Sequence, residues 1–223
     1  MKTLFLAAYF AGVARQFSDF AGETAGKKLV FIPTASLPEK VNFYVAADKK
    51  ALTRLGLILD ELEVSTASAS EIADKIGAAD FVFVEGGNTF FLLQELRRSG
   101  ADKHIIGHIA RGKPYVGASA GSMILAPNIE YARLMDDPAI APQLGGDFSA
   151  LAQVDFCVVP HFTNAPFKRA AEKIVAEYAS TLDLRPISNH QAIVVRGGET
   201  RTVSAPAAAG RQKGDGASAR KPA

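Results

Sequence analysis

The chain has 223 residues, of which 48% are hydrophobic, and it carries a formal net charge of +2 and a single cysteine. This length and apolar content predict one domain with a substantial buried core. One cysteine, Cys157, excludes an internal disulfide and favours a reducing, cytoplasmic setting, and the near-neutral charge gives no argument for binding to nucleic acid.

The chain begins with an apolar run that superficially resembles a signal peptide. Tyr9 and Gly12 interrupt this run early, and Lys2 is its single basic residue. We therefore predict a first buried strand over Leu4–Tyr9 instead of a cleaved leader. No apolar run in the sequence reaches the length of a membrane-spanning helix, so no membrane partner is expected.

Apolar and amphipathic segments alternate through the first two thirds of the chain. Short apolar runs bounded by Gly, Pro or polar residues are typical of buried strands, and helical spacing of apolar residues is typical of surface helices. The alternation predicts an α/β fold with a mostly parallel sheet that helices cover on both faces. After the first strand, the predicted strands are Leu29–Ile32, a strand within Leu57–Val64, Phe81–Val84, Tyr115–Val116, Phe156–Val159 and Ile193–Val195, and the predicted helices are Glu39–Leu55, Ala69–Ile76, Thr89–Arg98, Ile105–Arg111, Ser122–Ala126 and Phe167–Tyr178.

The last twenty residues differ in composition from the rest of the chain. Residues 204–223 are rich in Ala, Gly, Ser, Pro, Lys and Arg, so they are predicted to be a disordered basic tail. Five of the 25 basic residues but only one of the 23 acidic residues lie from Arg201 onward, which leaves 20 basic and 22 acidic residues before it. Residues 1–203 are predicted as a single, slightly acidic domain.

The most informative motif is the G-x-S-x-G pentapeptide Gly117–Gly121, which directly follows the apolar run Pro114–Val116. A serine between two glycines, after a strand and before a helix, is typical of a nucleophile elbow. This context predicts Ser119 as a nucleophile whose hydroxyl stands above the carboxyl edge of the sheet. The alternative is a turn rich in small residues that has no chemistry.

Four histidines are candidates for the base that such a serine needs. His161 follows the predicted strand Phe156–Val159, and catalytic groups of open α/β sheets gather at the ends of strands, so His161 is predicted as the base. His104 and His108 have one-turn spacing, but Ile105 stands where a zinc-peptidase helix has its glutamate. We predict both as solvated surface residues, and no metal or cofactor.

A second motif follows the predicted strand Phe81–Val84. Gly86 and Gly87 come after Glu85, and Asn88 or Thr89 is suited to begin a helix. The glycines allow close approach to a substrate, and the amides of Gly87 and Ala120 are predicted to bind a developing oxyanion. The motif also fits a phosphate-binding turn or a plain strand–helix connection, although it lacks the lysine of a P-loop.

Taken together, four motifs resemble those of the dipeptidase E family of serine peptidases, within the class I glutamine amidotransferase-like superfamily. They are Ile32–Ser36, Gly86–Phe90, Gly117–Gly121 and Pro160–Asn164, and the resemblance covers residues 1 to about 200. It implies a three-layer sandwich around a central, mostly parallel sheet. It also implies hydrolysis of dipeptides or short peptides through an acyl-enzyme on Ser119, with His161 as base. Serine in place of cysteine at this position argues against glutamine amide transfer.

The acid of the expected triad is open to several assignments. By resemblance, Asp136 matches an aspartate in a similar Asp-x-Pro context and is the predicted third member of the triad. Its neighbour Asp137 is an alternative, and an exposed acidic loop is the other interpretation of both residues. Relatives that place an acid before the last strand would use the segment Ser188–Ala192, which has no carboxylate here. In that case Asn189 or His190 would orient His161 by hydrogen bonding, with less electrostatic help than a carboxylate gives.

Substrate-binding residues are expected around the motifs. The resemblance places a basic residue for an N-terminal aspartate after Pro160–Asn164, where Arg169 is the candidate clamp, in a shifted register. Glu85 stands where the family has glycine, and a carboxylate there would bind a free amino group or repel an acidic side chain. The other residues predicted to line the substrate site are Asn88, Thr163 and Asn164.

Two other functions stay open from the sequence. A serine hydrolase of another substrate class (an esterase, an amidase or a cyanophycinase-like enzyme) would use the same nucleophile. A binding homologue without catalysis would use the pocket alone, a reading that the missing carboxylate at Asn189 favours. The expected partner is a small peptide substrate, and the expected assembly is a monomer or a small homo-oligomer.

Overall fold

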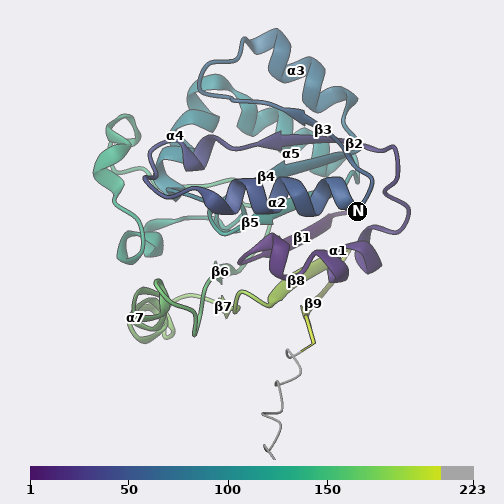
Figure 1. The fold of residues 1–223 in the computed structure, drawn as a ribbon. Coiled ribbons are helices and arrows are strands. Elements are labelled where there is room, and N and C mark those ends of the chain that lie inside the picture. Colours follow the sequence, from purple (N-terminus) through teal and green to yellow (C-terminus); the bar gives the residue numbers. More distant parts are fainter. Residues whose placement is uncertain (207–223) are drawn as a thin grey trace, which may run out of the picture.

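A seven-stranded sheet lies at the centre of the structure, a computed structural model in which residues 1–206 are described (Figure 1). Its strands are β1 (Thr3–Ala7), β2 (Lys28–Ile32), β3 (Ile58–Glu61), β4 (Phe81–Val84), β5 (Tyr115–Ala118), β8 (Gln191–Arg196) and β9 (Glu199–Ser204). Their order is β3-β2-β4-β5-β1-β8-β9. All pairs from β3 to β1 are parallel, whereas β8 is antiparallel to β1 and to β9. The predicted mostly parallel sheet is confirmed.

Helices cover both faces of this sheet, as Figure 1 shows. One face packs against α1 (Ala14–Ala21) and α2 (Phe43–Arg54) through a core rich in phenylalanine, in which the rings of Phe10 and Phe83 meet edge to face at 5.2 Å. The other face packs against α3 (Ala69–Ala78), α4 (Thr89–Ser99) and α5 (Ala101–Ala110) through a larger aliphatic core. The three-layer arrangement inferred from the sequence is therefore present.

Two further helices, a second small sheet and several single turns complete the structure. They are the short helix α6 (Ala120–Met123), the helix α7 (Lys168–Tyr178), the strands β6 (Cys157–Val159) and β7 (Leu184–Pro186), and the 3-10 turns η1 (Phe10–Gly12), η2 (Thr34–Ser36), η3 (Glu130–Leu134), η4 (Pro138–Ile140) and η5 (Pro142–Leu144). The predicted strand before Pro160 is present, but it pairs only with β7, in a separate parallel sheet. His161 therefore follows this small sheet and not the central one.

One helix, α1, and two strands, β7 and β9, were not predicted from the sequence, nor were the 3-10 turns η1 to η5. Strand β9 pairs with β8 across Gly197 and Gly198, so regular structure continues to Ser204, the first residue of the predicted tail. Residues 207–223 of that tail lie outside the described residues. Within residues 1–206, no helix has both the length and the apolar character to cross a membrane.

The prediction that His108 is a solvated surface residue is wrong. His108 is fully buried, because it follows Ala101 and Ile105 on the face of α5 that packs against the core. Its Nε2 lies 3.0 Å from the carbonyl oxygen of Pro114, and burial lowers the pKa of its ring to about 4. His104 is exposed, and the described chain contains no cluster of three or more His, Cys, Asp or Glu side chains that could hold a metal ion.

Strand β5 and helix α6 are held together by a buried hydrogen bond. The hydroxyl of Tyr115, which is fully buried, donates to the carbonyl oxygen of Gly121 at 2.6 Å. Gly117 faces the same turn so closely that a Cβ there would overlap the backbone of Gly121 and Ser122. The two contacts fix the bend between the strand and the helix.

The Tyr115→Phe variant tests this bond. It keeps the ring but leaves the Gly121 carbonyl buried without its donor, so we expect a loss of about 1–3 kcal/mol in the free energy of unfolding. Urea unfolding followed by circular dichroism measures this loss. The control is Tyr178→Phe, whose hydroxyl makes no hydrogen bond within residues 1–206 and whose loss we expect to stay below about 0.5 kcal/mol. Equal losses in the two variants would contradict the role given to Tyr115.

Candidate active site

Ser119 stands at the bend between β5 and α6, in a backbone conformation that residues with a side chain rarely adopt. Its φ is 48° and its ψ is −111°. Such a conformation costs about 1–3 kcal/mol and persists only where the surroundings hold it. Here the amide of Ser119 donates to Ala7 at 2.9 Å, and the hydroxyl of Ser122 donates to the carbonyls of Ala7 and Gly117 at 2.8 and 2.9 Å. The strand and the helix predicted on either side of the pentapeptide are both present.

His161 meets Ser119 from the loop after β6. The distance between Ser119 Oγ and His161 Nε2 is 2.9 Å, which is that of a hydrogen bond. The loop is fixed by two backbone bonds, from Phe162 to Ile187 at 3.0 Å and from Asn164 to His161 at 2.9 Å. Two residues that are 42 positions apart in the chain are thereby brought together, as the sequence predicted.

The other nitrogen of His161 meets Asn189, which lies just before β8. The distance between His161 Nδ1 and Asn189 Oδ1 is 2.7 Å. Asn189 is itself held by Asn164, whose Oδ1 accepts the backbone N–H of Asn189 at 2.9 Å. Asn164 was predicted to bind substrate, but its side-chain oxygen is used to fix the residue that orients His161.

The ring of His161 is in the protonation state that a base requires. Its burial lowers the pKa of the ring, against the hydrogen bond that the ring donates to Asn189, which raises that pKa. The ring is therefore neutral near pH 7, with its one proton on Nδ1 and shared with Asn189. The lone pair of Nε2 then faces the hydroxyl of Ser119, which can donate its proton to it.

The prediction that Asp136 orients His161 is wrong. Asp136 Oδ2 accepts the backbone N–H of Thr89 at 2.9 Å and its hydroxyl at 2.5 Å, so the carboxyl anchors the start of α4. Burial raises its pKa to about 6, although both bonds from Thr89 lower it. Its neighbour Asp137 accepts the N–H of Ala139 at 2.9 Å and caps η4. The position beside His161 belongs to Asn189 instead.

Two backbone amides beside Ser119 are free to bind a ligand. The amides of Gly87 and Ala120 make no hydrogen bond within residues 1–206. Gly87 has a φ of 137° and lies so close to Ala35 that a Cβ would overlap its carbonyl. A Cβ on Gly86 would lie 3.0 Å from Ser119 Cβ, so this loop runs directly beside the serine.

The other residues predicted to bind substrate differ in their exposure and in their hydrogen bonds. Asn88 caps α4, because its Oδ1 accepts the N–H groups of Phe90 and Phe91 at 3.0 Å each. Thr163, Arg169 and His190 are exposed. Glu85 is only 1% exposed, so the structure does not present its carboxylate to an amino group or an acidic side chain of a substrate. This burial is against direct binding of a substrate amino group by Glu85, whereas repulsion of an acidic side chain stays a prediction.

Two residues near this site were not singled out from the sequence. The ring of Phe167 stacks on that of His161, with centroids 4.9 Å apart, and it is 38% exposed. Asp48 is fully buried in α2, and its charge acts on Glu85. The sequence does indicate this burial, because Leu52 follows Asp48 one turn later on the apolar side of the helix.

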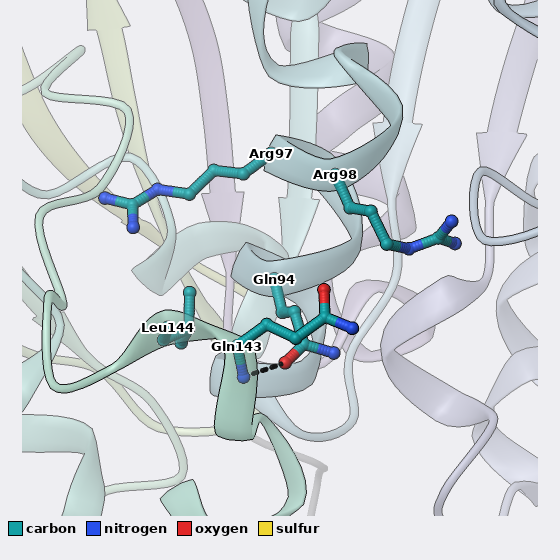
Figure 2. Close-up of a pocket in the computed structure, with 5 residues that line it drawn as sticks. All are labelled: Gln94, Arg97, Arg98, Gln143 and Leu144. Atoms are coloured by element: carbon teal, nitrogen blue, oxygen red, sulfur yellow. Dashed lines mark hydrogen bonds between the residues drawn. The ribbon is translucent and has the colours of Figure 1, made fainter.

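Two hollows on the surface, of about 250 and 480 Å³, do not include Ser119 or His161 among their lining residues. Figure 2 shows the smaller one, where the backbone N–H of Gln143 donates to Gln94 at 2.9 Å and the side chains of Arg97 and Arg98 point apart. Arg97 pairs with Asp147, and Arg98 with the buried carboxylate of Glu95. The two cations therefore do not converge on one ligand.

The family match and two similar known proteins all point to the same group of peptidases. The sequence pattern of the family described as peptidase family S51 matches residues 4–203. An uncharacterized peptidase of Listeria innocua is 52% identical over 202 residues, which cover 91% of this chain and 96% of that protein. Peptidase E of Citrobacter koseri is 35% identical over 142 residues, which cover 62% of this chain and 57% of that protein.

Two solved structures share the fold. A Listeria monocytogenes protein provisionally assigned to peptidase E is 50% identical, with a TM-score of 0.88 over 92% of this chain and 99% of its own. A peptidase from an acI-B1 actinobacterium is 23% identical, with a TM-score of 0.68 over 92% of this chain and 88% of its own, which shows a common fold alone.

The pKa of the His161 ring tests the hydrogen bond from His161 to Asn189. We expect it below about 6.5, the ordinary value for histidine, in the unchanged protein. Asn189→Ala removes a bond that raises this pKa and lowers it further, whereas Asn189→Asp supplies a carboxylate and raises it. Nuclear magnetic resonance of the ring protons against pH measures all three values.

The control for this titration is Asn128→Ala, whose side chain bonds to Glu130 in another loop. We expect it to leave the His161 ring unchanged. An Asn189→Asp protein whose His161 titrates at or below the unchanged value would contradict the assigned contact.

Proposed function

From the premise that this chain belongs to peptidase family S51, and so is a peptidase, we propose that it hydrolyses dipeptides or short peptides through an acyl-enzyme on Ser119. The observation that carries this proposal is the 2.9 Å distance between Ser119 Oγ and His161 Nε2. A neutral imidazole that is hydrogen-bonded to a serine at a strained strand–helix bend is the arrangement that activates a hydroxyl nucleophile.

In the proposed first half-reaction, Ser119 Oγ attacks the scissile carbonyl carbon as its proton passes to His161 Nε2. The imidazolium that forms donates from Nδ1 to Asn189 Oδ1. It then gives its Nε2 proton to the departing amine, which leaves an ester on Ser119. In the second half-reaction a water molecule attacks this ester, with His161 again as base, and the free acid leaves.

We assign the oxyanion of both tetrahedral intermediates to the amides of Gly87 and Ala120. Neither amide has an acceptor within residues 1–206, so both are available without breaking a bond. Donors that are already in place stabilise developing charge more than donors that must first reorganise. The closeness of Gly86 to Ser119 favours Gly87 in this role.

Asn189 sets the proposed mechanism apart from one with a carboxylate. Its amide oxygen can hold the ring of His161 in one tautomer, as an aspartate would. An amide carries no charge, however, so it stabilises the imidazolium less. Burial of His161 also disfavours the imidazolium, because it lowers the pKa of the ring.

Arg169 is the proposed clamp for an acidic N-terminal residue of the substrate. It lies in the first turn of α7, two positions after Phe167, which stacks on His161. Its exposed guanidinium would bind a carboxylate through two parallel hydrogen bonds. Thr163, which is exposed on the loop that carries His161, would line the same side of the proposed substrate site.

The proposed setting is a reducing compartment, the cytoplasm. Cys157 is buried, and burial raises the pKa of its thiol to about 11, so this side chain is a packing residue. A small peptide is the proposed substrate, and a monomer or small homo-oligomer is the proposed assembly.

Substitution of the nucleophile is the first test of this function. Ser119→Ala should lower kcat by about 10⁴-fold or more, because the covalent route is lost while the binding groups stay. Hydrolysis of a dipeptide panel, followed by amine release, measures kcat. The control is Ser70→Ala on the surface of α3, which should keep full activity. Full activity in the Ser119→Ala protein would eliminate the assigned nucleophile.

Labelling by a fluorophosphonate separates a hydrolase from a binding homologue. An activated Ser119 should form a stable adduct with this probe, and the Ser119→Ala protein should not. An inert serine in the folded, unchanged protein would favour the binding homologue. Faster hydrolysis of simple esters than of any peptide in the panel would favour an esterase.

Charge selection at Arg169 gives a separate test. Arg169→Ala should lower kcat/KM for dipeptides with an N-terminal aspartate by about 10- to 100-fold, mostly through KM, because a charge-assisted hydrogen bond contributes about 1.5–3 kcal/mol. Dipeptides that start with alanine should be cleaved as before. Lys168→Ala, its exposed neighbour, is the control. An equal loss for both kinds of dipeptide would refute a carboxylate clamp at this position.

A further inference from the structure

Two carboxyl groups lie buried beside the candidate active site, and no step of the proposed reaction uses them. Asp48, in α2, is fully buried, and Glu85, directly after β4, is 1% exposed. We refer to these two residues as the acid pair.

Each member of the acid pair holds the backbone of a different loop. Asp48 Oδ1 accepts the N–H of Ala11 at 2.9 Å, and Glu85 Oε1 accepts the N–H of Gly86 at 2.7 Å. Their second oxygens, Asp48 Oδ2 and Glu85 Oε2, are buried without a hydrogen-bond partner in the described part of the chain. Buried polar atoms in folded proteins are almost always hydrogen-bonded, and the charge of Asp48 acts directly on Glu85, so one proton held between the two carboxyls would satisfy both oxygens.

The electrostatics of the acid pair agree with one proton for two carboxyls. Burial raises the pKa of Asp48 to about 7, against hydrogen bonds from the amides of Ala11 and Phe10, which lower it. Burial and then the charge of Asp48 raise the pKa of Glu85 well above its usual value. Two ionised carboxylates in one buried site repel each other strongly, whereas a protonated one donates to the other.

Three other titratable groups face the acid pair. Burial is the first cause of the raised pKa of Tyr9 and of Tyr44, and the charges of the acid pair raise both further, so these phenols stay neutral. Lys49 lowers the pKa of Glu85, but its ammonium group is itself paired with Glu61. None of the three therefore supplies an unpaired positive charge that would let both members of the acid pair ionise.

The two loops that the acid pair holds touch the groups of the proposed reaction. Gly86 lies against Ser119 and precedes Gly87, whose amide is the proposed oxyanion donor. Gly12, next to Ala11, packs so closely on the backbone carbonyl of Asn189 that a Cβ there would overlap it. One loop therefore supports the oxyanion site, and the other supports the residue that orients His161.

We infer that Asp48 and Glu85 share a single proton, and that this bond between α2 and β4 positions the Gly87 amide and Asn189 for the reaction on Ser119. The positioning part of this inference rests on the proposed function. Loss of the shared proton to hydroxide leaves two negative charges in one buried site. Their repulsion moves both loops and lowers kcat on the alkaline side of neutral pH.

Stability against pH tests the shared proton without reference to any activity. A carboxyl whose pKa is higher in the folded than in the unfolded state stabilises the fold at low pH, and this contribution is lost as pH rises. The window runs from the unfolded value of about 4 to the folded value of Asp48, about 7. Within this pH range, the folding equilibrium constant falls by up to about tenfold per pH unit for each proton that the folded protein binds and the unfolded chain has lost.

The variants Asp48→Asn and Glu85→Gln replace one acid by an amide that donates permanently to the other. We expect each to unfold at a higher urea concentration than the unchanged protein at pH 8 and to lose this advantage at pH 5. Glu177→Gln, an exposed acid on α7, is the control and should follow the unchanged protein. Variants that share its pH dependence, or that are less stable at pH 8, would overturn the shared proton.

A measurement on the unchanged protein decides the matter even where a variant does not fold. Infrared difference spectra should show the carbonyl band of a protonated, buried carboxyl at pH 7.5, where ordinary carboxyls and the carboxyl of Asp136 are ionised. The band should disappear as pH rises to 9. Its absence at pH 7.5 would equally overturn the shared proton.

Peptide hydrolysis then tests the positioning role. We expect kcat of the unchanged protein to fall between pH 7 and pH 9, and to fall less in Glu85→Gln, with KM unaffected by pH. Glu85→Ala should lose kcat at every pH, since no donor is left. A fall that is the same in the unchanged protein and in Glu85→Gln would refute positioning. If no peptide is cleaved at all, the proposed function fails, and the unfolding and infrared results still decide on the shared proton.

Discussion

The hydrogen bond between Ser119 and His161 is the contact on which the rest of the site depends. It requires the serine to hold a φ of 48° at the end of β5, and it requires His161 to reach it from a separate two-stranded sheet. Neither condition is met by local sequence preference. Backbone bonds to β1, the close packing of glycines around α6 and the loop bonds of His161 together impose the geometry.

Neutral groups orient the base in this molecule. Asn189 occupies the place beside His161 where a serine-type triad has a carboxylate, and Asn164 in turn holds Asn189. Carboxyl groups lie elsewhere in the molecule, buried and bonded to backbone amides: Asp136 holds the start of α4, and the acid pair holds the loops that run beside Ser119 and Asn189. Carboxylates here support the framework around the base and do not contact it.

Much of the fold followed from hydrophobic periodicity, because buried parallel strands and amphipathic helices leave clear patterns. Ser119 and His161 were predictable since each follows an apolar strand. The partner of His161 was not, because a hydrogen bond between loops 28 residues apart leaves no pattern, and several polar residues competed for the role. The buried state of His108 and Glu85 was missed because polar residues on core-facing positions depend on packing. Strand β9 was missed although Gly197 and Gly198 mark its hairpin turn.

The most direct test of the central claim is to locate the covalent intermediate. An aspartyl active ester, for which release of the acid limits turnover, is mixed with the protein, quenched in acid within milliseconds and mapped by mass spectrometry. We expect one acyl group on the peptide that contains Ser119, which forms before the acid is released and then decays. Steady turnover with that peptide unmodified, or with the acyl group on another side chain, would contradict it.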